Sequence, residues 1–148
     1  EPLRAPMGWT ADTQRGGFTS GTPFRPMAPN VARNNVAAQL ADPNSLLSFY
    51  KSMLALRNHL PSLASGSYDT PQVQGKVMAY RRTLGAQTTL VVTNYGRKSA
   101  TIRPNQLAPR AAFMQAYPQR TKVMAASAGG VLSVRLPGQS VRVFTLQP

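Results

Sequence analysis

The stretch DPNSLLSFYKSMLALRNHL, residues 42–60, carries the only long helical period of this sequence. Asp42 followed by Pro43 predicts the start of a helix, because a carboxylate accepts unpaired backbone N–H groups and proline suits the first helical position. Asn44 is an alternative cap, and Pro61 predicts the end of the helix. We expect loop before this helix and short strands after it.

The predicted helix has one apolar face, which needs a surface to pack against. The positions on this face and beside it are Leu46, Leu47, Tyr50, Met53, Leu54 and Arg57.

Residues 1–41 are predicted to form a long irregular loop, because five prolines and four glycines interrupt any helix or central strand. A loop of this length is either a functional lid on a larger body or a disordered segment. Trp9, Phe18 and Phe24 favour the lid, since aromatic side chains in a loop need something to pack against.

The period changes from helical to alternating after a turn-rich connection at residues 61–75. Strands are predicted at residues 76–82, 88–95, 99–103, 112–117, 131–136 and 140–146. Turns are predicted at residues 95–98 and 136–139. Alternating apolar positions that predict a core are Val77, Leu90, Val92, Phe113, Val131, Val141 and Phe144. The fold class is therefore mainly β, an antiparallel sandwich or barrel.

The composition is strongly basic, with 17 Lys and Arg, four acids and a formal net charge of +13 among 148 residues. The cations are spread along the chain without an aromatic-interleaved basic motif, so we expect a basic solvated surface and no nucleic-acid partner.

No apolar run has the length of a membrane span, and we expect a soluble chain without a membrane partner. The absence of a starting Met suggests a trimmed or excised segment. The compartment is not determined, with the periplasm or the exterior favoured over the cytoplasm.

Few catalytic arrangements are open to a chain with four acids, one His and no Cys. Nothing brings Asp12 and Asp42 together as a catalytic pair, and Asp42 is better explained as a helix cap. His59 is predicted to lie near a helix C-terminus, where it interacts with the helix dipole. A lone His holds no metal, so we expect no metal, no cofactor and no catalytic residue in this chain.

Several separated motifs nevertheless share the order and spacing of a known family. They are RAPMGW at 4–9, GFTSGTPF at 17–24, NV at 35–36, DPNSLL at 42–47, LR at 56–57 and GSY at 66–68. These motifs resemble the C-terminal part of an alpha-amylase-superfamily enzyme, more narrowly the alpha-glucosidase and trehalose-synthase branch of glycoside hydrolase family thirteen. The resemblance is specific for residues 4–68 and only topological for the strands after residue 76.

In that family a (β/α)8 catalytic barrel is followed by a C-terminal antiparallel sandwich. The resemblance implies that residues 1–60 are the end of the barrel, namely the loop after its last strand and its last helix. It implies that residues 61–148 are the C-terminal sandwich domain. The partners are then the catalytic barrel of the parent enzyme and an alpha-linked glucose substrate, and the long loop would line the active site, as loops at the carboxyl ends of barrel strands do.

The family's nucleophile and acid/base carboxylates lie on earlier barrel strands and have no counterpart here, so the chain alone is expected to be inert. Arg4 matches the motif arginine that contacts glucose hydroxyls in family members, and an equally good interpretation makes it a loop anchor. The sequence departs from the motif at Gly8, where Gln is usual, at Thr10, where Asp is usual, and at Phe24, where Trp is usual. These departures bear on the substrate more than on the family.

Two hypotheses that assign the chain to other functional classes stay open. One is a free-standing β-sandwich that binds carbohydrate or a polyanion through its basic surface. The other is a structural interaction module that binds neither. A gene that continues upstream into a barrel with the family's carboxylate motifs would favour the enzyme segment.

Overall fold

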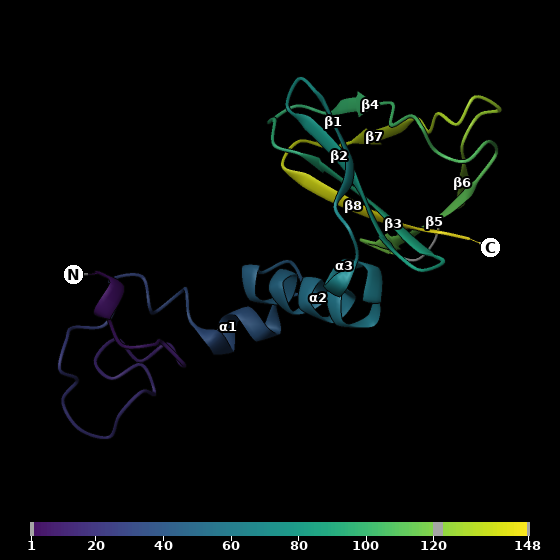
Figure 1. The fold of residues 1–148 in the computed structure, drawn as a ribbon. Coiled ribbons are helices and arrows are strands. Elements are labelled where there is room, and N and C mark those ends of the chain that lie inside the picture. The colour runs from purple at the N-terminus through teal and green to yellow at the C-terminus, as the bar shows by residue number, and fades with distance from the viewer. Residues whose placement is uncertain (1, 120–122, 148) are drawn as a thin grey trace. The chain divides into compact units, whose positions relative to one another are not determined.

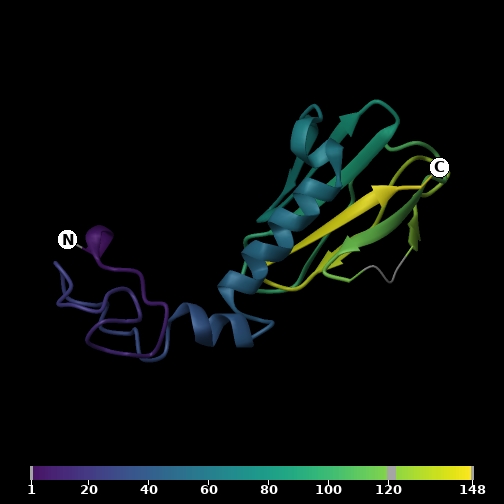
Figure 2. The ribbon, with the colours of Figure 1, turned by 90° about the horizontal axis from the view of Figure 1, so that it is seen from below.

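The computed structural model describes residues 2–119 and 123–147 (Figure 1). It forms two compact units, unit 1 at Glu1–Ala55 and unit 2 at Leu56–Pro148. The long helix α2 (Leu46–His59) runs across the boundary and is followed at once by the short helix α3 (Pro61–Ser65), as Figure 2 shows.

Unit 1 is mostly irregular, as predicted, but it contains two elements that the sequence did not predict. A 3-10 helix η1 spans Pro2–Arg4, and a helix α1 spans Val36–Ala41. The prediction of uninterrupted loop to residue 41 is therefore wrong. The side chain of Asn35 caps α1 by accepting a hydrogen bond from the Ala38 N–H, which explains why a short helix starts there.

Helix α2 begins at Leu46, and not at Pro43 as predicted. The Ser45 hydroxyl oxygen accepts the Ser48 N–H at 3.1 Å and so caps the helix. The Asp42 carboxylate accepts the Asn44 N–H at 2.8 Å in the preceding turn, so it is not the cap. The helix ends at His59, but Pro61 starts α3 instead of closing α2, since proline suits the first position of a helix.

Unit 2 is built on a six-stranded antiparallel sheet with the strand order β1-β2-β3-β8-β5-β6. Its strands are β1 (Asp69–Gln74), β2 (Val77–Leu84), β3 (Gln87–Asn94), β5 (Ala112–Tyr117), β6 (Val123–Ala125) and β8 (Ser140–Leu146). A second antiparallel sheet pairs β4 (Ala100–Ile102) with β7 (Val134–Leu136). The mainly antiparallel β prediction is confirmed.

Two edge strands were missed by the sequence analysis. β1 lies in the stretch predicted as a connection and contains Pro71, which an edge strand tolerates because it has no ladder partner on one side. Its pairing with β2 is irregular between Asp69 and Gln72. β6, at the other edge, has only three residues, too few to show an alternating pattern.

The two predicted turns connect different sheets and are not hairpin turns. β3 pairs with β2 and β8, while β4, which follows the first turn, pairs with β7. The buried side chain of Asn94 holds both turns together, because its amide nitrogen donates to the carbonyls of Lys98 at 3.0 Å and Pro137 at 2.8 Å. Its amide oxygen accepts the Gly96 N–H at 2.8 Å. One buried amide thus fixes two of the places where the chain passes from one sheet to the other.

The apolar core fills the space between the two sheets. It is formed by Val77, Ala79, Leu90, Val92, Phe113 and Phe144 from the large sheet, Ile102, Val134 and Leu136 from the small one, and Leu107, Ala126 and Leu132 from loops. Five of the seven predicted core positions are buried. Val131 and Val141 are only partly buried. Leu132 and Val134 take the inward positions near Val131, and on β8 the core residue is Phe144, so Val141 lies on the other face of the sheet.

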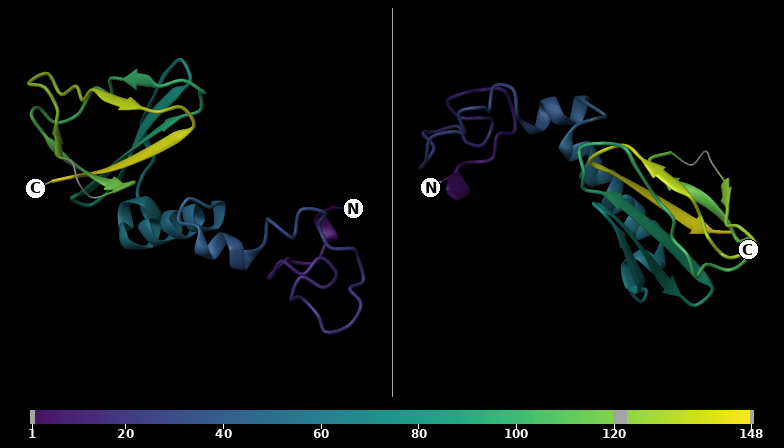
Figure 3. Two further views of the ribbon diagram at one scale, coloured as in Figure 1. Left: turned by 180° about the vertical axis from the view of Figure 1, so that it is seen from behind. Right: turned by 90° about the horizontal axis from the view of Figure 1, so that it is seen from above.

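The small sheet and α3 lie on opposite faces of the large sheet (Figures 1 and 3). The residues of β3 that share the core are Leu90 and Val92. Thr89, which points the other way, bonds through its hydroxyl to that of Ser62 on α3 at 2.7 Å. The face towards the small sheet is thereby separated from the face that carries α3.

A pair of glycine variants tests the packing of the loop over the core. Gly130 has φ +70°, and a Cβ there would lie 2.1 Å from the Leu107 carbonyl oxygen. Gly75 has a similar φ of +60° in a hairpin turn with nothing within 4 Å of a Cβ. Gly75→Ala should lower the free energy of unfolding by about 1 to 2 kcal/mol, the cost of the left-handed conformation. Gly130→Ala should cost about 1 to 3 kcal/mol more because of the clash. Urea denaturation of both variants measures the difference. Equal losses of unfolding free energy in the two variants would contradict the close packing of Gly130 against the Leu107 carbonyl.

Candidate functional site

The loop of unit 1 holds the one site residue that the sequence singled out, Arg4. It ends η1 and is exposed. Its guanidinium carbon lies 6.0 Å from the centre of the Phe24 ring, within the range of a cation–π contact. The structure therefore brings Arg4 next to an aromatic residue of the second motif.

A second arginine, which the sequence analysis did not select, reaches the same ring. The guanidinium carbon of Arg25 lies 5.5 Å from the Phe24 ring centre. Its Nε is buried and donates no hydrogen bond to any group in the described part of the chain. Phe24 itself is 86% exposed. The only sequence signal for Arg25 was its position beside the motif phenylalanine.

The loop that carries these residues is internally hydrogen-bonded. The N–H groups of Trp9 and Thr10 both donate to the Gly16 carbonyl, at 2.7 and 2.9 Å. The N–H of Val36, the first residue of α1, donates to the Gly8 carbonyl at 2.9 Å. Asn35 is 3% exposed and donates to the Val31 carbonyl at 2.9 Å, which ties the loop to the start of α1.

Gly8 also explains one departure from the family motif. A Cβ at Gly8 would lie 2.5 Å from the Cγ2 atom of Val31, a buried residue of the same loop. A longer residue at position 8 therefore requires the Val31 side chain to move. The departure is accommodated by local packing.

The candidate acids and the histidine do not form a catalytic arrangement in the described part of the chain. Asp12 and Asp42 are exposed, and each accepts a backbone N–H two residues ahead, Gln14 and Asn44 respectively. Asp69 accepts the Ser67 hydroxyl. His59 is exposed in the last turn of α2, as predicted.

Residues 2–119 and 123–147 contain neither a metal-ligand cluster nor a membrane-spanning helix. No group of three or more His, Cys, Asp or Glu side chains there is arranged to hold a metal ion. None of the helices in the same ranges combines the length and apolarity needed to cross a membrane.

Tyr68 and Tyr80 form an aromatic pair in unit 2, with ring centres 4.8 Å apart. Burial raises the pKa of Tyr80 above its ordinary value, and the neighbouring Tyr68 adds to the shift. The Tyr80 phenol therefore stays neutral at physiological pH. This pair serves packing and does not supply a base.

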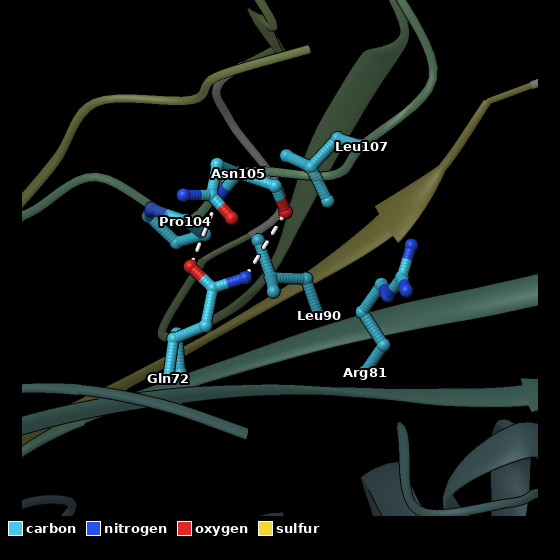
Figure 4. Close-up of a pocket in the computed structure, with 7 residues that line it drawn as sticks. Gln72, Arg81, Leu90, Pro104, Asn105 and Leu107 are labelled. Carbon is cyan, nitrogen blue, oxygen red and sulfur yellow. Dashed lines mark hydrogen bonds between the residues drawn. The ribbon is translucent and has the colours of Figure 1, made fainter. Parts of the chain in front are cut away.

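A hollow beside β1 and β2 is closed by structural hydrogen bonds and offers no ligand site (Figure 4). The Gln72 amide nitrogen donates to the Asn105 carbonyl at 3.1 Å, and its amide oxygen accepts the Asn105 N–H at 3.0 Å. Arg81 Nη1 donates to the Gln106 carbonyl at 2.8 Å. These bonds hold the loop after β4 against the large sheet.

Comparison with known proteins identifies the class. Residues 1–66 match the model of the alpha amylase catalytic domain. The chain is 39% identical over 101 residues to an oligo-1,6-glucosidase of Parageobacillus thermoglucosidasius, a match that covers 68% of this chain and 18% of that enzyme. It is 35% identical over 108 residues to the trehalose-6-phosphate hydrolase of Bacillus subtilis (strain 168), covering 72% of this chain and 19% of that enzyme.

The structure agrees with these matches. It resembles the trehalulose synthase MutB from Pseudomonas mesoacidophila MX-45 with a TM-score of 0.73 and 27% identity, covering 97% of this chain and 25% of that one. The class is therefore that of the glycoside hydrolases. The chain belongs to the alpha-amylase superfamily, in the alpha-glucosidase and trehalose-synthase-like branch of glycoside hydrolase family thirteen. It spans about a fifth of the length of the curated relatives and a quarter of that structure.

Proposed function

We propose that this chain is the non-catalytic C-terminal segment of an alpha-glucan-active glycoside hydrolase or transglycosylase. The observation that carries the proposal is the coverage: the chain matches nearly all of its own length to a quarter of a solved structure of the family. Retaining glycosidases need two carboxyl groups that flank the scissile bond. The three described acids, Asp12, Asp42 and Asp69, are each engaged with a local donor instead.

In this proposal residues 1–60 complete the catalytic barrel and residues 61–148 form the domain that follows it. Exposed apolar side chains of unit 1 support the first part. Leu46, Tyr50 and Leu54, which lie on or beside the predicted apolar face of α2, are 66, 57 and 56% exposed. No residue of α2 is fully buried. A helix with an uncovered apolar face fits the last helix of a barrel whose other elements lie outside this chain.

The proposed role of the loop is to supply Arg4 to the substrate site. Arg4 and Arg25 place two positive charges at one exposed phenylalanine, and the buried Nε of Arg25 has no acceptor among the described residues. Two guanidinium groups at one place favour a carboxylate from another segment. In the complete enzyme the planar fork of Arg4 would bind vicinal hydroxyls of the terminal glucose beside that carboxylate.

The proposal is tested by joining the chain to the coding sequence upstream of it. The 148-residue chain alone should not hydrolyse 4-nitrophenyl α-glucoside, because it lacks an acid/base and nucleophile pair. The longer product should do so, and its upstream part should contain the family's aspartate and glutamate motifs. Turnover by the short chain that is abolished by Asp12→Asn would place a catalytic carboxylate in the loop and contradict the proposal.

Arg4→Ala in the longer enzyme should lower kcat/KM, with a loss of transition-state stabilisation of about 2 to 4 kcal/mol, because the variant leaves the partner carboxylate buried and unpaired. This corresponds to roughly 30-fold to 1000-fold. The matched control is Arg15→Ala, which removes an exposed arginine from the same loop. If Arg4→Ala leaves kcat/KM at the wild-type value and lowers only the melting temperature, Arg4 is a loop anchor.

A further inference from the structure

Unit 2 contains an open groove of about 570 Å³ that no part of the proposed function uses. Ligand sites in proteins commonly have about 300 to 1,000 Å³. Three arginines from separate segments line it: Arg103 follows β4, Arg135 lies on β7 and Arg142 lies on β8. We call this feature the arginine groove.

The remaining walls of the arginine groove are hydroxyl-bearing or apolar. Ser99, Thr101 and Ser133 supply hydroxyl groups, and Met124 and Pro137 supply apolar surface. Thr101 is the direct partner of Arg135 in the β4–β7 ladder. Hydroxyl groups and guanidinium groups are both donors to phosphate oxygens. None of the described lining residues is aromatic, so these residues do not form the stacking platform of a typical sugar site.

The charge of the arginine groove is not compensated by acidic side chains. The sequence has no Asp or Glu after Asp69. Within the described residues, the guanidinium groups of Arg103, Arg135 and Arg142 donate no hydrogen bond. Arg142 lies opposite the core residue Val92 in the β3–β8 ladder, so its side chain leaves the strand on the core side of the sheet, where it is partly buried. A partly buried cation without a partner is costly, unless an anion occupies the groove.

The position of the arginine groove leaves it accessible. The small sheet that contributes Arg135 packs on one face of the large sheet, and α3 packs on the other (Figures 1 and 3). Helix α3 directly follows α2, the helix assigned above to the end of the barrel. A partner on the α3 face therefore does not cover the groove.

We propose that the arginine groove binds a ligand that carries two or more phosphate groups. Arginine binds phosphate through two parallel N–H donors, and three guanidinium groups from separate segments suit an extended or multiply phosphorylated ligand more than a single phosphate. The proposal concerns unit 2 alone and does not depend on the catalytic assignment.

Isothermal titration calorimetry of the full chain with inorganic tripolyphosphate tests the proposal. We expect saturable binding with one ligand per chain that weakens as salt is added, since ion pairs are screened. Inorganic monophosphate should bind at least 10-fold more weakly. A sugar bisphosphate serves as a second probe. Whichever of tripolyphosphate and the sugar bisphosphate binds more tightly indicates whether free oligophosphate or a phosphorylated sugar is the better ligand.

The double variant Arg135→Gln with Arg142→Gln should weaken tripolyphosphate binding at least 10-fold. The charge-matched control is Arg15→Gln with Arg33→Gln, two exposed arginines of unit 1, which should change binding less than 2-fold. Circular dichroism melting verifies that each variant is folded. If the groove variant does not fold, the single variant Arg103→Gln, outside the ladders, replaces it.

Amide shifts in NMR spectra of the wild-type chain locate the ligand independently of any variant. They should concentrate at Ser99, Thr101, Ser133 and Arg135 on titration with tripolyphosphate. Two outcomes would show only general attraction to a basic surface and overturn the proposal. One is an equal loss of tripolyphosphate affinity in the groove and control variants, and the other is amide shifts that spread over all basic segments without saturation. Absence of binding by both probes would also overturn it.

Discussion

The fold of unit 2 depends on the closure of an apolar core between a large sheet and a small one. Phe144 and Phe113 from the large sheet and Val134 and Leu136 from the small sheet are buried together. The small sheet has only three residues in each strand, so it is stabilised by this burial and not by its own ladder. The chain changes sheet four times as the core closes, and the buried amide of Asn94 holds two of these crossings, from β3 to β4 and from β7 to β8.

The described residues of unit 1 form no comparable core. Its buried side chains include Met27, Val31 and Asn35, and its conformation is maintained largely by backbone hydrogen bonds of the loop. The exposed aromatics of the loop and the exposed apolar face of α2 are explained if they belong to a larger body. This contrast between the β unit, which has a core of its own, and the loop and helix unit supports the proposal that the chain is a segment of a larger family-thirteen enzyme.

Sequence patterns predicted what depends on local order. Alternation at Val77, Leu90 and Val92 predicted strands and core, and the spaced motifs in residues 4–68 identified the family. The pairing of strands was not predictable, because it is decided by contacts such as that of Asn94 with Pro137, 43 residues apart. β1 was missed since its proline is tolerated only at an edge, a property of the assembled sheet. The arginine groove joins residues 103, 135 and 142, which no local pattern connects.

Amide hydrogen exchange on the 148-residue chain tests the central claim, that unit 2 is self-sufficient and unit 1 is not. The account predicts the slowest exchange in β2, β3 and β8, whose amides lie in the middle of the large sheet, and much faster exchange in residues 2–35. Slow exchange in that loop together with fast exchange throughout the strands would contradict the division of the chain and the role assigned to each part.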